Sequence, residues 1–173
     1  MVLGMSLANF TLLHVVISLV GVAAGLIAMA GMLASRPLPG WTALFLATTI
    51  LTSVTGFFFP VEKLLPSHII GILSLVLLAI ACLALYGRKL SGAWRWIYVV
   101  TALASLYLNV FVMVIQSFLK IGPLHALAPS VPPSEPPFAI VQGIVLIAFV
   151  VAGIFALKKF HPAQPVPIDY ATR

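Results

Sequence analysis

The chain alternates between long apolar runs and short segments that carry charge, proline or glycine. The clearest run is residues 67–86, SHIIGILSLVLLAIACLALY, which contains no Asp, Glu, Lys or Arg and is followed by Gly87, Arg88 and Lys89. An α-helix rises about 1.5 Å per residue, so about 20 such residues match the roughly 30 Å hydrocarbon core of a bilayer. This run therefore predicts a membrane-spanning helix.

Four other runs show the same pattern. We expect five transmembrane helices, at about residues 7–34, 41–59, 67–87, 95–119 and 138–158. Together they predict an all-α integral membrane protein, packed as a small helical bundle over residues 1–160, with a proline-rich cytoplasmic tail at residues 161–173. The composition agrees, because 62% of the residues are hydrophobic and only 7% are charged, against about 25% charged in soluble domains.

Positively charged residues gather beside alternate ends of these runs. One side of the membrane receives Arg36, Arg88, Lys89, Arg95, Lys158, Lys159 and Arg173, and the other side receives only Lys63 and Lys120. Cytoplasmic connections carry the excess of Lys and Arg, so we expect the N-terminus outside and the C-terminus inside. The expected location is the bacterial inner membrane. Because the cations flank the spans, the net charge of +6 predicts contact with lipid head groups and no nucleic-acid partner.

The first span carries a stripe of small residues at alternating steps of three and four. Its packing positions are Ser18, Gly21, Gly25 and Ala28, which include a GxxxG pair. Helices in a membrane associate through close packing of such residues, so we expect the first span to be the central helix. Small-residue faces on several spans also favour a homo-oligomer or a place in a larger membrane complex.

Strongly polar residues within the spans gather in the outer half. They are His14, His68, Asn109, Gln116 and Gln142. Amides inside an apolar span are unfavourable unless they find hydrogen-bond partners. Two interpretations remain open. These residues serve helix packing and meet water at the outer boundary, or they converge on one pocket that opens outward.

Such a pocket supports two functional hypotheses. The first is a non-enzymatic membrane component that binds a lipid-like or quinone-like ligand. The alternative is a redox protein in which His14 and His68 ligate a haem b or a metal ion, because neutral imidazole is the commonest metal ligand. His125, in a later loop, is a candidate third ligand for copper or zinc.

The sequence gives little support for an enzyme or an ion-coupled transporter. No Asp, Glu, Lys or Arg lies in the interior of a span, and the three acidic residues, Glu62, Glu135 and Asp169, lie in loops or the tail. Proton relays usually need an ionisable group at membrane depth. The chain also lacks paired carboxylates, a GxSxG elbow, an HExxH motif and a CxxC motif, and no histidine lies at the depth of the single cysteine, Cys82. We therefore expect no catalytic residue.

Overall fold

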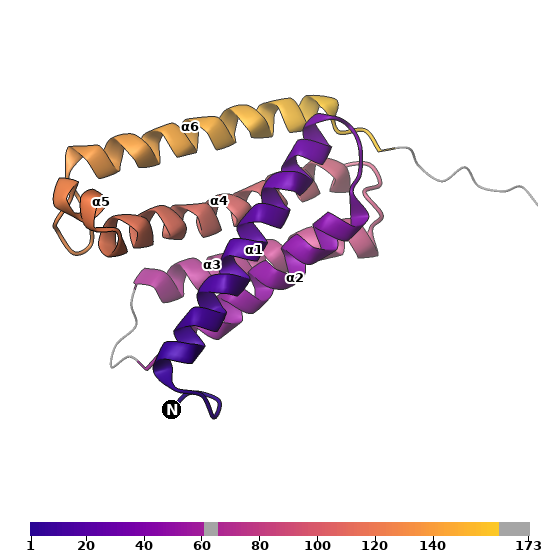
Figure 1. The fold of residues 1–173 in the computed structure, drawn as a ribbon. Helices are drawn as coiled ribbons and strands as arrows, with labels where there is room; N and C mark the ends of the chain where they lie inside the picture. The colour runs from indigo at the N-terminus through magenta and orange to yellow at the C-terminus, as the bar shows by residue number, and fades with distance from the viewer. Residues whose placement is uncertain (61–65, 163–173) are drawn as a thin grey trace, which may run out of the picture.

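A computed structural model describes residues 1–60 and 66–162, and within these ranges the chain is helical and contains no β-strand. The elements are α1 (Leu7–Leu33), α2 (Pro39–Gly56), α3 (Pro66–Cys82), which continues into the π-helix η1 (Leu83–Gly87), α4 (Trp94–Lys120), α5 (Gly122–Leu127) and α6 (Pro136–Lys159) (Figure 1). The expectation of an all-helical fold is confirmed. Most of the expected proline-rich tail, residues 163–173, and Lys63 in the α2–α3 connection lie outside the described residues.

Local sequence explains where the helices begin. The Ser6 hydroxyl accepts a hydrogen bond from the Asn9 backbone N–H (3.2 Å) and so caps α1. Helix α2 begins at Pro39 and α6 at Pro136, and the first helical turn tolerates proline because its N–H groups have no partner within the helix. The α1–α2 turn includes Ser35 in the left-handed region (φ 52°).

Four helical segments are long and apolar enough to cross a membrane: Leu7–Leu33, Ser67–Gly87, Trp94–Lys120 and Pro136–Lys159. Helix α2 is not among them. It has 18 residues, but threonines at positions 42, 48, 49, 52 and 55 and a serine at position 53 lower its mean hydropathy. The expected second span is therefore an 18-residue helix whose hydroxyl side chains are all buried or partly buried.

The helix ends gather at two opposite ends of the bundle (Figure 1). One end holds the α1–α2 turn, the η1–α4 turn and the C-terminal end of α6, while the N-terminus and α5 lie toward the other. The first carries Arg36, Arg88, Lys89, Arg95, Lys158 and Lys159, and is called the basic end below. The Arg95 guanidinium joins two of its elements by donating hydrogen bonds to the carbonyl oxygens of Leu157 (3.0 Å) and Phe160 (2.8 Å).

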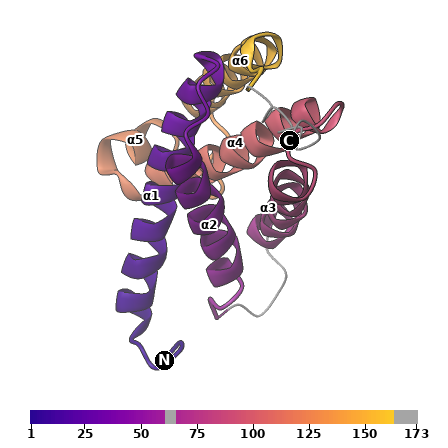
Figure 2. The same cartoon turned by 90° about the vertical axis from the view of Figure 1, so that its right-hand side faces the viewer.

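Helix α4, and not α1, is the central helix of the bundle. It packs against α1, α2, α3, α5 and α6, and 50% of its most apolar stretch is buried, against 28% for α1. Neighbours on several sides come close because α4 carries small residues on its buried faces, including Thr101, Ala102 and Ser105. Helices α1 and α2 lie side by side, α3 lies beside α2, and α6 lies beside α4 (Figure 2).

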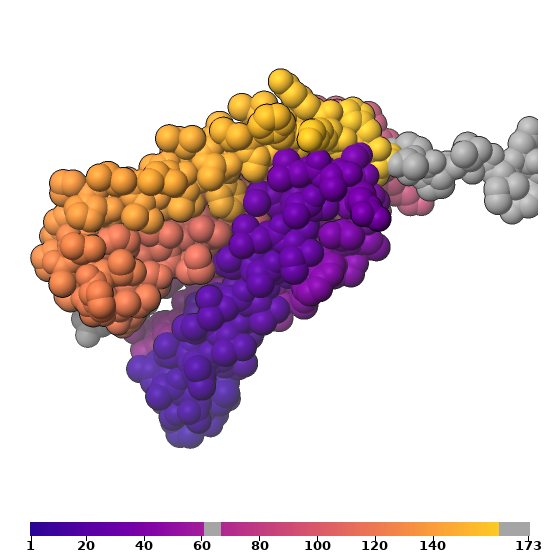
Figure 3. Space-filling view, turned by 45° about the horizontal axis from the view of Figure 1, so that its top comes forward, coloured from indigo at the N-terminus to yellow at the C-terminus, as the bar shows by residue number. Residues whose placement is uncertain are grey.

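The small-residue stripe of α1 lies against α2 and α4. Gly21, Gly25 and Ala28 are buried, whereas Ser18 is partly buried and its hydroxyl donates to the His14 carbonyl oxygen of its own helix (2.7 Å). A Cβ atom at Gly25 would overlap the side chain of Leu106 in α4 and approach the Phe45 ring of α2 to 2.8 Å. Further toward the N-terminus, α1 separates from the α4–α6 pair (Figure 3) and stays packed on α2 and the residues that follow it.

The connection between α5 and α6 is organised by one carboxylate. Glu135 accepts hydrogen bonds from the Ser130 hydroxyl (2.5 Å), from the Ser130 backbone N–H (2.9 Å) and from the Ser134 backbone N–H (3.0 Å). These hydrogen bonds, the Ser130 hydroxyl first, lower the pKa of the Glu135 carboxyl to about 2. The carboxylate therefore stays ionised and keeps this loop closed across the physiological pH range.

Candidate functional site

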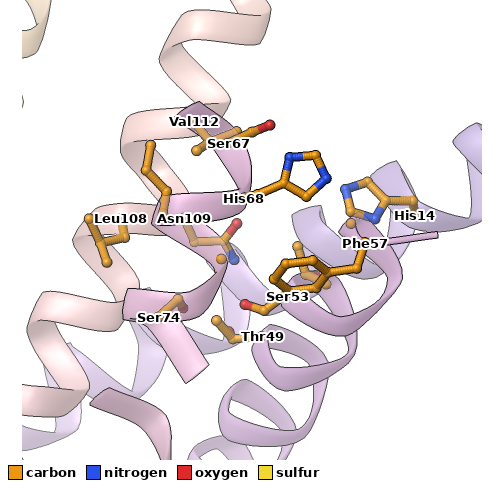
Figure 4. A pocket seen from close by; sticks show the side chains of 14 residues that line it. His14, Thr49, Ser53, Phe57, Ser67, His68, Ser74, Leu108, Asn109 and Val112 are labelled. Atoms are coloured by element: carbon orange, nitrogen blue, oxygen red, sulfur yellow. The ribbon is translucent and has the colours of Figure 1, made fainter. Parts of the chain in front are cut away.

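A cavity of about 110 Å³ lies between α1, α2, α3 and α4, on the side of the bundle away from the basic end. Polar residues contribute much of its lining (Figure 4). They are His14 from α1, Thr49, Thr52 and Ser53 from α2, Ser67, His68 and Ser74 from α3, and Asn109 from α4. Apolar parts of the wall include Phe57, Ile70, Leu108 and Val112.

His14 is held by its neighbours on α2. Its Nδ1 atom lies 2.8 Å from the Thr55 hydroxyl oxygen, and that hydroxyl donates to the Leu51 carbonyl oxygen (2.7 Å). When the Thr55 hydroxyl donates to Leu51, its oxygen accepts from Nδ1–H, and Nε2 of the neutral imidazole is then an acceptor. The ring also meets Phe59 edge-on, with centroids 5.1 Å apart. These contacts fix the orientation of the His14 ring.

His68, near the start of α3, lies beside His14 at one edge of the cavity (Figure 4). It is only 8% exposed, and its ring packs against Phe57 with centroids 5.5 Å apart. A histidine in the first turn of a helix is often exposed to water, but here the C-terminal end of α2 covers it. The structure therefore brings both histidines to the same cavity.

Three buried polar atoms of the lining have no hydrogen-bond partner within the described residues. They are Nδ2 of Asn109 and the hydroxyl oxygens of Thr49 and Thr52. Gly21 lets Asn109 Nδ2 and the Thr49 hydroxyl come close to α1. A Cβ atom at position 21 would lie only 3.3 Å from Asn109 Nδ2 and 3.2 Å from the Thr49 hydroxyl. A buried polar group left without a partner costs about 1–3 kcal/mol. All three atoms are enclosed by protein, and their residues form part of the wall of one cavity.

Two of the five expected pocket residues do not line this cavity. Gln116 lies near the end of α4, one turn beyond the last lining residue of that helix, and is exposed. Gln142 is buried, and its Nε2 donates to the Phe111 carbonyl oxygen (3.1 Å), which joins α6 to α4. The expectation that all five residues converge is therefore corrected to His14, His68 and Asn109.

Hydroxyl groups of α2 and α3 complete the lining. Thr49 is 1% exposed and Ser74 is 4% exposed, and both residue types are ordinary in a membrane helix, where a hydroxyl can bond to a carbonyl oxygen of its own helix. The signal in the sequence was the concentration of five threonines in the 18 residues of α2.

The lining can form hydrogen bonds with a neutral ligand. Asn109 and the hydroxyls offer donors, His14 offers an acceptor, and none of the lining residues is Asp, Glu, Lys, Arg or Cys. In the described part of the chain, no three residues among His, Cys, Asp and Glu are grouped so that they would hold a metal ion. His125, on α5, therefore does not join the two cavity histidines as a third ligand.

Comparisons with protein-family models, with curated proteins and with solved structures find no match for this chain.

Proposed function

We propose that this protein is a non-enzymatic integral membrane protein that binds the polar head of a quinone-like molecule in the cavity between α1, α2, α3 and α4. The observation that carries this proposal is a cavity with no charged residue in its lining, whose wall includes three residues, Asn109, Thr49 and Thr52, that each hold a buried polar atom without a partner among the described residues. The atoms come from two helices that are far apart in sequence, so simple packing within one helix does not account for them.

The chemistry of a quinone head suits these groups. Its carbonyl oxygens accept hydrogen bonds from an amide N–H or a hydroxyl, and its flat ring packs on an aromatic side chain such as Phe57. A cavity of about 110 Å³ is smaller than the roughly 300–1,000 Å³ of sites that enclose drug-sized ligands. The head group alone therefore enters, and an isoprenoid tail lies between the helices or in the lipid.

The alternative, a haem b held by His14 and His68, has support from the position of both imidazoles at one cavity. The same volume argues against it, because a porphyrin is itself larger than most drug-sized ligands. We therefore favour the quinone-like ligand. A haem absorption band in the purified protein would reverse this order.

We also propose that α2 completes a five-crossing topology, with the basic end in the cytoplasm. The support is that α2 has 18 residues, lies beside α1 and runs between the same two ends of the bundle (Figure 1). The excess of Lys and Arg at the basic end orients it inward. The aliphatic face of α6, with Ile140, Ile144 and Ile147 exposed, then meets lipid.

This topology predicts the behaviour of reporter fusions. A periplasm-active enzyme fused after residue 173 is expected to be inactive, and the same enzyme fused before Met1 behind an exported linker is expected to be active. Cysteine substitution at the exposed Ser130 supplies the matched outer site, which a membrane-impermeant thiol reagent should label in intact cells. Activity of the C-terminal fusion would contradict the five-crossing arrangement.

The binding proposal predicts a specific loss in one variant. Asn109→Leu is expected to weaken binding of a short-chain quinone, such as decylubiquinone, by about tenfold or more, because a hydrogen bond from a buried amide is lost. Gln116→Leu removes an exposed amide from the same helix and is expected to leave binding unchanged. Equilibrium binding in detergent micelles measures both. Equal binding by wild type and Asn109→Leu, or no binding by wild type, would refute a quinone site here.

A further inference from the structure

A second cavity, of about 360 Å³, lies at the basic end and is separate from the proposed quinone site. The α1–α2 turn, η1 and α4 form its walls, and Phe160 at the end of α6 closes one side. Most of the lining is aliphatic or aromatic, and Arg36 is the only charged residue in it. The first cavity, by contrast, has no charged residue in its lining.

The polar groups inside this cavity are already satisfied. Tyr98 is 1% exposed, and its hydroxyl forms a hydrogen bond with the Thr42 side chain. The interior of the cavity therefore offers an apolar surface, and its polar side chains do not need a hydrogen bond from a ligand. Arg36 is exposed, and its guanidinium lies beside a wall made rigid by Pro37 and Pro39.

The backbone around the cavity departs from regular helix where it forms the walls. Leu85 and Tyr86 line the cavity from η1, a π-helix, and such turns frequently mark functional sites. The next wall residue, Leu90, has a left-handed conformation (φ 57°), and its N–H bonds back to the Ala84 carbonyl oxygen (3.0 Å). Both departures from regular helix therefore lie in the wall of the cavity.

Among the described residues, the charged side chains at the basic end are all positive. Besides Arg36, the basic end carries Arg88, Lys89, Lys158 and Lys159. Glu135 is the only acidic residue within the described ranges, and it lies in the α5–α6 connection at the opposite end. An anion at Arg36 therefore meets a favourable potential, and basic pockets between membrane helices are typical sites for anionic lipid head groups.

We propose that this cavity binds one anionic phospholipid from the leaflet at the basic end, with its phosphate on Arg36 and the first part of an acyl chain against Pro39, Ala43 and Leu85, the accessible apolar residues of the lining. The volume falls within the range of sites that enclose part of a ligand of this size. The phospholipid is present at high local concentration at this depth, which a free phosphate is not, and the apolar lining has no use for a free phosphate. The site is independent of the quinone proposal.

Native mass spectrometry of the full chain in detergent tests this site. Mixed micelles with dioleoyl phosphatidylglycerol are expected to give one retained lipid per chain, and micelles with dioleoyl phosphatidylcholine are expected to give much less. Arg36→Gln should weaken retention of phosphatidylglycerol by about tenfold, the loss expected for one charge-assisted hydrogen bond. Lys158→Gln removes the same charge from the same end, outside the cavity, and should change retention by less than about twofold because exposed charges are screened at ordinary ionic strength.

A cavity-filling variant tests whether lipid binding needs the space of the cavity as well as the positive charge around it. Ala43 lines the cavity and is exposed. Ala43→Trp therefore fills space in the cavity without burying a larger side chain in the core. This variant should lose the retained lipid and keep the thermal stability of wild type. The proposal is overturned if both lipids are retained equally, if Lys158→Gln weakens retention as much as Arg36→Gln, or if Ala43→Trp retains the lipid as wild type does. Loss of quinone binding in these variants is not expected.

Discussion

Gly25→Ala is expected to lower the free energy of unfolding by about 2 kcal/mol, in the range measured for overpacked cores. The added methyl would overlap the Leu106 side chain and lie 2.8 Å from the Phe45 ring. Both neighbours are only 1% exposed, so neither moves away without disturbing α2 or α4. Unfolding of the full chain in mixed micelles, driven by increasing SDS, gives the free energy for wild type and variant.

Gly143→Ala is the matched control for this prediction. Gly143 lies within α6, and a Cβ atom there meets nothing within 4 Å. The control should be as stable as wild type or more stable by up to about 1 kcal/mol, because alanine is the better helix former. Adding Leu106→Ala to the Gly25 variant should relieve the overlap, so the double variant is expected to be more stable than the two separate losses predict. Equal stability of Gly25→Ala and Gly143→Ala would contradict this close contact.

The glycine contact was predictable from sequence, whereas the identity of the central helix was not. A stripe at steps of three and four specifies a packing face, and Gly21, Gly25 and Ala28 are indeed buried. It does not say how many neighbours a helix has. Helix α4 contacts more helices than α1, and its buried residues, among them Val99, Thr101 and Leu103, lie on more than one of its faces.

The sequence predicted only part of the cavity lining. Counting residues from the span ends gives the depth of a side chain but not the direction in which it points. Asn109 and Gln116 are seven residues apart and so share a face of α4, yet the cavity ends at Val112 and leaves Gln116 exposed. Gln142 belongs to α6, which contacts α4 and α1 but not α2 or α3, so it lies away from the cavity.

Asn109→Leu is expected to raise the free energy of unfolding of the ligand-free protein by about 1–2 kcal/mol, even though it removes a binding residue. Nδ2 of Asn109 is buried without a partner within the described residues, and leucine has nearly the same volume. The substitution removes an unsatisfied polar group and keeps the packing. Ser105→Ala is the control, because the Ser105 hydroxyl is satisfied by the Thr101 carbonyl oxygen of its own helix (2.8 Å), and it should change stability little.

Adding ligand should stabilise wild type more than the variant. A ligand that binds only the folded state stabilises it by RT ln(1 + [L]/Kd), which is about 2.7 kcal/mol at a concentration of 100 Kd. With decylubiquinone at that concentration, wild type should gain this amount, and Asn109→Leu, with binding weakened about tenfold, should gain only about half of it. The ligand therefore removes about 1.3 kcal/mol of the variant's advantage, which reverses the order where that advantage is about 1 kcal/mol and narrows it where it is about 2 kcal/mol. If Asn109→Leu is less stable than wild type without ligand, Asn109 serves packing, and the cavity needs no ligand to account for its polar lining.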